Sequence, residues 1–320
     1  MRKSIAPRAV LSLNGALSLI GTLLRVSARP LISALSLICT LALIGGALAV
    51  SSTPAFAQQK AKALQIKGSD TMVNLGQAWA EAFSKSHPGV NIAVTGGGSG
   101  TGFSALINGT CDIAESSRAI EAKEIAQAEA KGVKPNQETV ALDGIAIVVN
   151  LKNPVKNLTI DQLREIFMGN IVNWKTIGGS NKPIVILSRE FNSGTHIFFK
   201  EHVLRRGIAK GPEEFSPAAL MMPSSQAIAD EIAGNENAVG YYGMGYISPR
   251  QKVIAVAKDA KSPFIEPTIE AVKSSLYPIS RPLYIYTNGK PQGIIKEFMD
   301  FVYSKEGQEI VKKIDFVPIK

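Results

Sequence analysis

Three strand–turn–helix units follow one another within about sixty residues, and this succession restricts the fold more than any other feature of the sequence. Short apolar stretches at 63–67, 90–94 and 111–114 each precede a turn rich in glycine or hydroxyl side chains and then a segment with helical periodicity. Such alternation predicts a parallel sheet with crossover helices, and therefore an α/β fold. The three turns lie at the carboxyl ends of the strands, where open α/β sheets bind their ligands.

A fourth turn between a predicted strand and a predicted helix, residues 188–196, carries the groups expected of an anion site. The N-terminus of a helix presents unpaired N–H groups and the positive end of its dipole. Ser193 and Thr195 add hydroxyls, and Gly194 lets a ligand approach the backbone. Arg189 presents a planar fork of donors that matches two anion oxygens. A capped helix beside an exposed arginine would show the same residues, so this stretch alone leaves both interpretations open.

The remaining sequence continues the α/β pattern and predicts two lobes. A strongly apolar stretch at 142–150 is long enough to cross from one lobe to the other, and a return strand is expected near 238–242. Further elements are expected at 158–167 (helix), 283–286 (strand) and 293–314 (two helices). We assign 58–145 and 240–320 to lobe I and 146–239 to lobe II, with residues 188–196 in a cleft opposite the three N-terminal turns.

The first 57 residues predict an export signal. They contain five basic and no acidic residues, and an uncharged apolar run at 31–50 is followed by a small-x-small site at Ala55 and Ala57. The apolar run is long enough to span a bilayer, so an uncleaved anchor is the alternative. The Ala-Phe-Ala cleavage motif that ends this segment favours cleavage between Ala57 and Gln58.

Removing that segment weakens the case for a polyanionic partner. The whole chain has a net charge of +9, but the 30 basic and 26 acidic residues after the signal leave only +4. No nucleic-acid partner is indicated by so small an excess. Cys111 is then the only cysteine, so the exported fold has no internal disulfide and must be held by its core.

Catalytic, metal and nucleotide sites are poorly supported. The polyglycine turn at 96–102 lacks the Lys-Ser/Thr pair of a P-loop, and the acidic residue of a dinucleotide fingerprint is missing. His87, His196 and His202 are too scattered to give metal-ligand spacing. Ser193 with His196 could be a nucleophile and base, but adjacent turns of one helix seldom converge on a substrate carbonyl. We therefore predict no enzyme activity, no metal and no cofactor.

Five short motifs occur in order along the chain. They are 68–72 (Gly-Ser-Asp-Thr-Met), 97–102 (Gly-Gly-Ser-Gly-Thr-Gly), 112–118 (Asp-Ile-Ala-Glu-Ser-Ser-Arg), 188–195 (Ser-Arg, then Asn-Ser-Gly-Thr) and 277–283 (Tyr-Pro-Ile-Ser-Arg-Pro-Leu). In these motifs the chain after the signal resembles the periplasmic phosphate-binding proteins of ABC transporters. The resemblance implies a two-lobed, type II periplasmic-binding-protein fold with parallel or mixed sheets. It also implies a periplasmic protein that closes over inorganic phosphate and delivers it to permease subunits in the inner membrane; such a carrier is expected to be a monomer.

The resemblance also implies the phosphate contacts. They fall on Ser69, Asp70, Thr71, Met72 (through its backbone), Ser99, Ser117, Arg118, Arg189, Ser193, Gly194 and Thr195. At the position of Ser117, well-known members have an aspartate. That carboxylate accepts the proton of monohydrogen phosphate and so discriminates against sulfate. Arg118 looks able to bind the anion here. Asp70 could supply the missing acceptor or be only a helix N-cap, and Glu115 is the next candidate.

Two other functions use the same fold. A binding protein for molybdate, tungstate or sulfate would have the same architecture, because fold does not fix the ligand. A surface-attachment protein would keep the lobes and use its exterior. The retention of Arg189 with its serine and threonine set argues against loss of anion binding.

Overall fold

The computed structural model describes residues 63–320. All the described residues belong to one compact unit. The predicted signal and its cleavage site lie outside the described residues. Within residues 63–320 no helix has both the length and the apolar character needed to cross a membrane.

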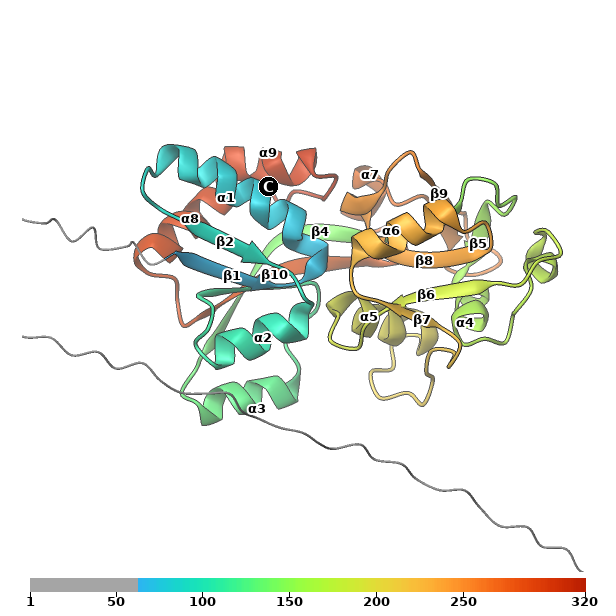
Figure 1. Cartoon of the computed structure of the whole chain (residues 1–320), viewed down its shortest axis with the longest axis horizontal. Helices are drawn as coiled ribbons and strands as arrows, with labels where there is room; N and C mark the ends of the chain where they lie inside the picture. Colours follow the sequence, from blue (N-terminus) through green and yellow to red (C-terminus); the bar gives the residue numbers. More distant parts are fainter. Residues whose placement is uncertain (1–62) are drawn as a thin grey trace, which may run out of the picture. The chain divides into compact units, whose positions relative to one another are not determined.

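The first lobe is built on a mixed sheet. Its strands are β1 (Leu64–Gly68), β2 (Ile92–Thr95), β3 (Ile113–Ser116) and part of β10 (Ser280–Asn288). β1 runs parallel to β2 and β3, and β10 runs antiparallel to β3. One face carries α1 (Val73–Ser86), α8 (Gly293–Tyr303) and α9 (Lys305–Lys313), and the other carries α2 (Ser99–Ile107) and α3 (Ala122–Ala130) (Figure 1). The predicted crossover units are therefore confirmed.

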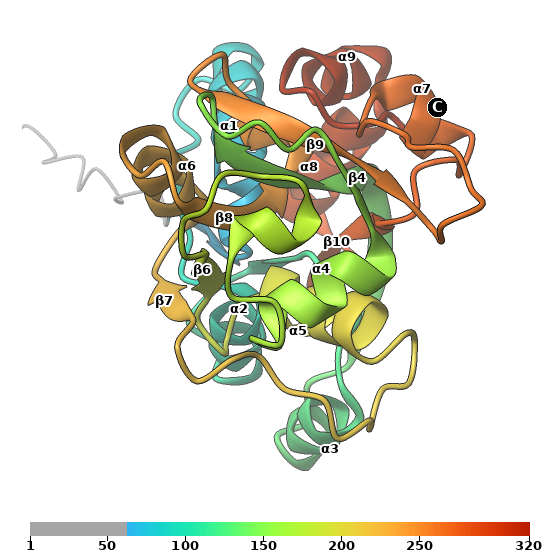
Figure 2. The ribbon, with the colours of Figure 1, turned by 90° about the vertical axis from the view of Figure 1, so that its right-hand side faces the viewer.

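The second lobe follows the same plan. Its strands are β5 (Asn157–Thr159), β6 (Val185–Arg189), β7 (Leu220–Met222), β8 (Ala238–Gly243) and β9 (Gln251–Ala257). Its helices are α4 (Ile160–Phe167), α5 (Gly194–Phe199), α6 (Ser225–Gly234) and α7 (Ile269–Lys273). Figure 2 shows α4 and α5 below these strands, α6 beside β8 at the left and α7 at the upper right. β6 runs parallel to β7 and β8, as a crossover fold requires.

Two long strands connect the lobes. β4 (Pro135–Asn150) pairs with β10 along its first part and with β8 and β9 along its second. Figure 1 shows β4 and β10 running from one lobe to the other. β4 begins well before the predicted 142–150, because its first residues are polar and partly exposed and give no apolar signal. The lobe boundaries given above stay a prediction; the grouping described here differs from them by placing β9 and α7 with the second lobe, since β9 pairs with β5 and with the second part of β4.

The helical periodicity of α1 explains how the first lobe holds its turns in place. Leu75, Trp79 and Phe83 recur at intervals of four and are fully buried, whereas Glu81 on the opposite side is exposed. The Trp79 indole donates a hydrogen bond to the carbonyl of Gly307 in α9, 2.9 Å away. These contacts fix α1, and with it the turn after β1, against the sheet.

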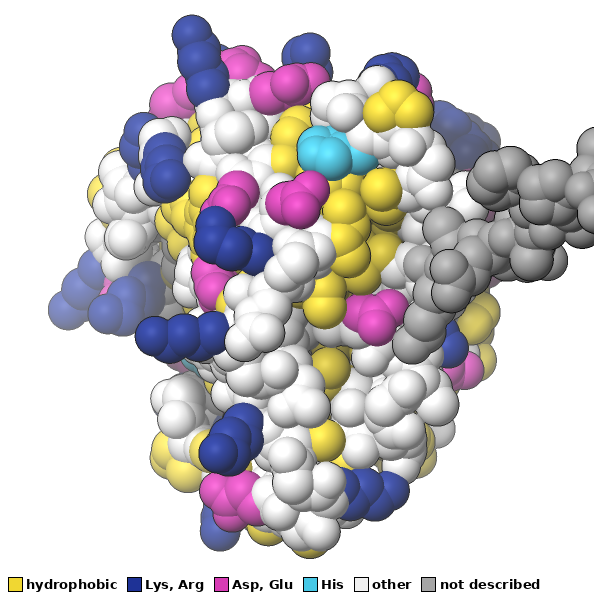
Figure 3. All heavy atoms as spheres, turned by 90° about the vertical axis from the view of Figure 1, so that its left-hand side faces the viewer, with side chains coloured by type: hydrophobic (Ala, Val, Ile, Leu, Met, Phe, Trp, Pro, Cys, Tyr) yellow, Lys and Arg dark blue, Asp and Glu magenta, His cyan; other side chains and the backbone are white. Residues whose placement is uncertain are grey.

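Charged side chains of both signs are interspersed on the end of the first lobe that Figure 3 shows. Lysine and arginine side chains on this face do not gather into one patch. A nucleic-acid surface requires such clustering, so this face gives no support for a polyanionic partner.

Candidate functional site

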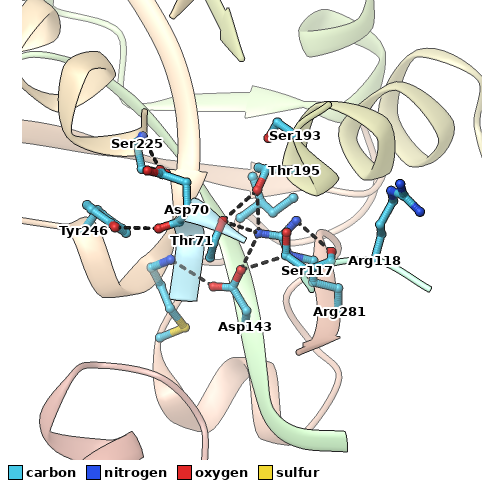
Figure 4. Close-up of polar contacts among 12 residues, drawn as sticks. Asp70, Thr71, Ser117, Arg118, Asp143, Ser193, Thr195, Ser225, Tyr246 and Arg281 are labelled. Carbon is cyan, nitrogen blue, oxygen red and sulfur yellow. Dashed lines mark hydrogen bonds and ion pairs between the residues drawn. The ribbon is translucent and has the colours of Figure 1, made fainter. Parts of the chain in front are cut away.

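The turns that the sequence singles out meet between the lobes. Thr71 lies in a short 3-10 helix (Asp70–Met72) after β1, Ser99 begins α2, Ser117 follows β3, and Thr195 lies in the first turn of α5. The Oγ1 atoms of Thr71, from the first lobe, and Thr195, from the second, are 2.8 Å apart. On the first lobe, the Oγ atoms of Ser99 and Ser117 are 3.4 Å apart. Four buried hydroxyls from the two lobes thus form one cluster, of which Figure 4 shows Thr71, Ser117 and Thr195.

The first turn of α5 closes directly over this cluster. A Cβ atom on Gly194 would lie 2.3 Å from Ser99 Oγ and 2.7 Å from Ser117 Oγ, so only glycine permits this approach. Ser193 is the N-cap of α5 and accepts a hydrogen bond from the N–H of His196. The first N–H groups of a helix have no acceptor within it, so the turn brings hydrogen-bond donors to the hydroxyls.

Asp70 of the first lobe and Arg189 of the second form an ion pair. The Arg189 Nη1 donates to Asp70 Oδ2 at 3.0 Å, and the N–H of Ser225, at the start of α6, donates to the same oxygen at 2.7 Å. The other donors of Arg189 reach the Ser225 hydroxyl and the carbonyls of Met222 and Pro223. The alternative that Asp70 caps its own helix is wrong, because its carboxylate points to the second lobe.

A second ion pair, which the sequence did not reveal, lies beside the hydroxyls. Arg281 on β10 donates through Nε and Nη2 to Asp143 Oδ2 on β4, at 2.9 and 2.7 Å. Its Nη2 also lies 3.0 Å from Thr195 Oγ1 and 3.4 Å from Thr71 Oγ1. Burial raises the pKa of the Asp143 carboxyl, and the adjoining guanidinium opposes that shift. Two features of the sequence could have indicated this pair. Asp143 is an acid in an otherwise apolar strand, and Arg281 lies inside the motif at 277–283.

Three predicted residues are engaged elsewhere. The Met72 N–H donates to the carbonyl of Ser69, 2.9 Å away, and the N–H of Ser69 donates to the carbonyl of Glu115. Arg118 makes a bidentate pair with Glu124 at the start of α3, with both N···O distances 2.7 Å. Figure 4 shows Arg118 turned away from the hydroxyl cluster. The Arg118 guanidinium is therefore not part of the hydroxyl cluster, although Arg118 and Ser117 line one neighbouring cleft. The contact of Arg118 with phosphate stays a prediction.

Glu115 is buried under α1. A Cβ atom on Gly76 of α1 would lie 2.4 Å from Glu115 Oε1, so the carboxyl packs against that helix. Within residues 63–320 neither carboxyl oxygen has a hydrogen-bond partner. Burial raises the pKa of this carboxyl to about 8. Glu115 therefore packs against the helix backbone, while the Ser117 hydroxyl contacts Ser99.

The geometry of His196 disfavours a nucleophilic serine. The Nδ1 atom of His196 lies 3.1 Å from the Ser188 hydroxyl, which also contacts the Tyr241 hydroxyl at 2.7 Å. The ring stacks on Phe215 with centroids 4.5 Å apart, and burial lowers the pKa of the imidazole to about 4. The ring nitrogen thus contacts Ser188 and not Ser193. The described part of the chain holds no cluster of three His, Cys, Asp or Glu side chains suited to a metal ion.

A cleft of about 430 Å³ lies next to the hydroxyl cluster, between the lobes. Ser117 and Arg281 line it from the side of the cluster, and Phe198 and His202 line it from the second lobe. The Arg281 guanidinium lies 5.6 Å from the centre of the Phe198 ring. The cleft thus connects the buried polar groups with the surface.

Comparisons with known proteins agree with this arrangement. The sequence model of the PBP superfamily domain matches residues 53–306. Phosphate-binding protein PstS of Pseudomonas aeruginosa is 33% identical over 298 residues, 86% of this chain and 90% of the relative. Phosphate-binding protein PstS of Bacillus subtilis is 34% identical and covers 84% of this chain and 85% of its own length. A phosphate ABC transporter substrate-binding protein from Clostridium perfringens, solved with bound phosphate, has a TM-score of 0.72 at 33% identity. It covers 81% of this chain, and the match spans 100% of that chain.

Proposed function

Because the chain belongs to the PBP superfamily, and within it to the PstS family of phosphate-binding proteins, we propose that it captures inorganic phosphate for an ABC transporter. The observation that carries this proposal is the cluster of Thr71, Ser99, Ser117 and Thr195 hydroxyls under the first turn of α5. A tetrahedral anion placed there would accept hydrogen bonds from both lobes at once.

The charges beside the cluster are compensated. Arg189 is paired with Asp70, and Arg281 with Asp143, so neither guanidinium is a free counter-ion for the ligand. Hydroxyl and backbone N–H dipoles would therefore meet most of the charge of the anion. Dipoles fixed by the fold need little rearrangement on binding, and this favours a small anion of defined geometry.

Phosphate is favoured over other oxyanions. The relatives from Pseudomonas aeruginosa and Bacillus subtilis are both named phosphate-binding proteins, and the Clostridium perfringens structure holds phosphate. None of these three is named for molybdate, tungstate or sulfate. We propose phosphate contacts from Thr71, Ser99, Ser117, Ser193, Gly194 and Thr195. The hydroxyl pairs Thr71–Thr195 and Ser99–Ser117 and the close approach of Gly194 to Ser99 support this set.

The remaining aspects of the function follow from the family and from the site. As a substrate-binding protein the chain would act without catalysis, in keeping with the orientation of His196. It would be exported after cleavage near Ala57, act in the periplasm as a monomer, and deliver phosphate to permease subunits in the inner membrane. Closure of the lobes over the anion would be the signal that the permease reads.

Equilibrium dialysis of the purified protein with radiolabelled phosphate tests this proposal. We expect saturable binding of one phosphate per chain, and a loss of at least about tenfold in affinity in Thr71→Val and Thr195→Val, since each removes one donor. Thr176→Val, on the partly exposed 3-10 helix Trp174–Ile177 of the second lobe, is the control. Absence of phosphate binding by the wild-type protein would contradict the proposal.

A further inference from the structure

The Arg281 guanidinium contacts residues of the proposed anion site in both lobes. Its Nη2 lies 3.0 Å from the hydroxyl oxygen of Thr195 in the second lobe and 3.4 Å from that of Thr71 in the first. Its Nη1 donates to the carbonyl of Ser117, 3.1 Å away. Arg281 is almost completely buried, so these contacts are not exchanged with water.

The chemistry of the guanidinium fixes the role of the two hydroxyls. Arginine has N–H donors and no acceptor, and one of the two Nη2 hydrogens is directed to Asp143. Thr71 and Thr195 therefore share the other hydrogen and can only accept it. Each hydroxyl has a single hydrogen, which must then point away from the guanidinium. Without a ligand one hydroxyl can donate to the other, since their oxygens are 2.8 Å apart. With an anion in place both hydrogens are directed to it.

Asp143 holds the guanidinium in this orientation. Arg281 and Asp143 are direct partners in the register of β10 and β4, and Asp143 Oδ2 accepts from both Nε and Nη2. Asp143 Oδ1 accepts from the N–H of Met244 at 3.0 Å. Gly243 is required beside them, because a Cβ atom there would lie 2.6 Å from Thr71 Cγ2 and 2.9 Å from Asp143 Oδ2. The Asp143 carboxylate, the Ser117 carbonyl and the threonine hydroxyls therefore hold the Arg281 guanidinium in place.

The position of Arg281 in the fold links it to closure. β4 and β10 are the strands that connect the lobes, so Arg281 and Asp143 do not belong to one moving part alone. Thr71 and Thr195 belong to different lobes, and one Nη2 atom reaches both only when the lobes are together. The donor pair is thus complete only in the closed arrangement, and Figure 4 shows Arg281 beside both Thr71 and Thr195.

We propose that Arg281 is a positioning residue that makes Thr71 and Thr195 simultaneous hydrogen-bond donors to the bound anion when the lobes close. This inference rests on the proposed phosphate-binding function. Arg281 acts through the two hydroxyls, which donate to phosphate and to sulfate alike. It contributes to affinity for tetrahedral dianions in general and not to the choice between them.

Arg281→Lys is the direct test, because an ammonium keeps the charge but cannot reach Asp143, Thr71 and Thr195 with one planar group. We expect phosphate and sulfate affinities, measured by calorimetric titration, to fall by a similar factor of at least about ten. Arg164→Lys is the matched control: Arg164 also contacts two carboxylates and a carbonyl, but it lies on α4, outside the site. Its phosphate affinity should stay within about twofold of wild type.

A double-mutant cycle distinguishes positioning from a general structural role. Thr195→Val should lower phosphate affinity at least about tenfold in the wild-type background but less than about threefold in Arg281→Lys, because the hydroxyl is no longer held as a donor there. Equal losses in both backgrounds would overturn the inference. So would an Arg281→Lys protein whose phosphate affinity is within twofold of wild type.

Two further variants keep the test decisive if Arg281→Lys does not fold. Arg281→Gln combined with Asp143→Asn removes both buried charges together, and the same loss of affinity is expected. Thr195→Val changes no charge, and unchanged phosphate affinity in this variant would overturn the inference by itself. If wild type and Arg164→Lys both bind no phosphate, the proposed function has failed. If they bind and only the effect of Arg281 is missing, the present inference alone has failed.

Discussion

Asp70 of the first lobe and Arg189 of the second are joined by an ion pair whose atoms Oδ2 and Nη1 lie 3.0 Å apart. The side chain of Arg189 is 2% exposed and that of Asp70 is 15% exposed, so the pair is shielded from water. Ser225 donates its N–H to the same carboxylate oxygen. The carboxylate that sequence reasoning offered as the proton acceptor for phosphate is therefore engaged by the second lobe, and it helps to hold the lobes together.

Arg189→Ala should weaken phosphate binding strongly. The substitution leaves the Asp70 carboxylate without its counter-ion, and removing one partner of a buried pair costs on the order of 3–5 kcal/mol. We expect a loss of at least about a hundredfold in phosphate affinity by calorimetry, together with a lower melting temperature. Arg206→Ala removes the exposed ion pair with Asp161 and should change neither the phosphate affinity nor the melting temperature. A loss of less than tenfold in Arg189→Ala would contradict this account of the pair.

Asp70→Asn should lower phosphate affinity and narrow the preference for phosphate over sulfate. The amide can still accept from the Ser225 N–H, but the variant loses the ion pair with Arg189 that helps to hold the lobes together, which lowers affinity. It also no longer repels the second negative charge of sulfate, which narrows the preference. The measurement is a competition titration of phosphate against sulfate. Affinity and selectivity that both match the wild type would show that the carboxylate charge has no part in binding.

Gly194→Ala should prevent closure without unfolding the protein. The new methyl group would lie 2.3 Å from Ser99 Oγ, a contact that exists only when α5 is packed against the first lobe. We expect phosphate binding to fall at least about a hundredfold, while far-ultraviolet circular dichroism stays unchanged. Gly234→Ala is the control, because no atom lies within 4 Å of a Cβ there. Normal phosphate binding in Gly194→Ala would contradict the closed geometry.

Glu115→Gln should stabilise the protein increasingly as the pH rises. Burial raises the pKa of the Glu115 carboxyl from 4.5 to about 8, so the folded protein binds this proton more tightly than the unfolded chain. The contribution of protonated Glu115 to the free energy of unfolding is therefore fully present below about pH 4.5. It is lost as the pH rises toward 8, by up to about 1.4 kcal/mol per pH unit. Glutamine does not titrate, so the stability of the variant lacks this dependence on pH.

Urea unfolding of wild type and Glu115→Gln at several pH values between 4.5 and 8 checks this prediction. The difference in the free energy of unfolding should grow across the range in favour of Glu115→Gln. Glu129→Gln, on the exposed side of α3, should show no such trend. A constant difference at every pH would mean that Glu115 does not titrate in this range.

Sequence patterns predicted the fold well where the chemistry is local. Leu75, Trp79 and Phe83 repeat with helical spacing, and the structure buries all three on one face of α1. Ser193 and Thr195 were singled out because a strand-to-helix turn with hydroxyls is a local feature, and the structure places both at the start of α5. The packing of that turn against Ser99 depends on how two lobes meet, which no local pattern reveals.

Side-chain partners between distant segments were not predictable in the same way. Asp70 and Arg189 are 119 positions apart in the chain, and Asp143 and Arg281 are 138 apart. Even for Arg118, whose partner Glu124 is only six positions away, the sequence does not show which of the neighbouring acids Glu115, Glu121 and Glu124 accepts its guanidinium. Local patterns predict which side chains are polar and where their strands end. The choice among several carboxylates for each arginine is made by tertiary packing.

Calorimetric titration of the wild-type protein with phosphate, followed by sulfate and molybdate, tests the central claim most directly. The account predicts saturable binding of one phosphate per chain, with sulfate and molybdate at least about tenfold weaker. The same series on Thr71→Val ties any binding to the hydroxyl cluster. Binding of sulfate or molybdate more tightly than phosphate, or no heat of binding with phosphate at all, would contradict it.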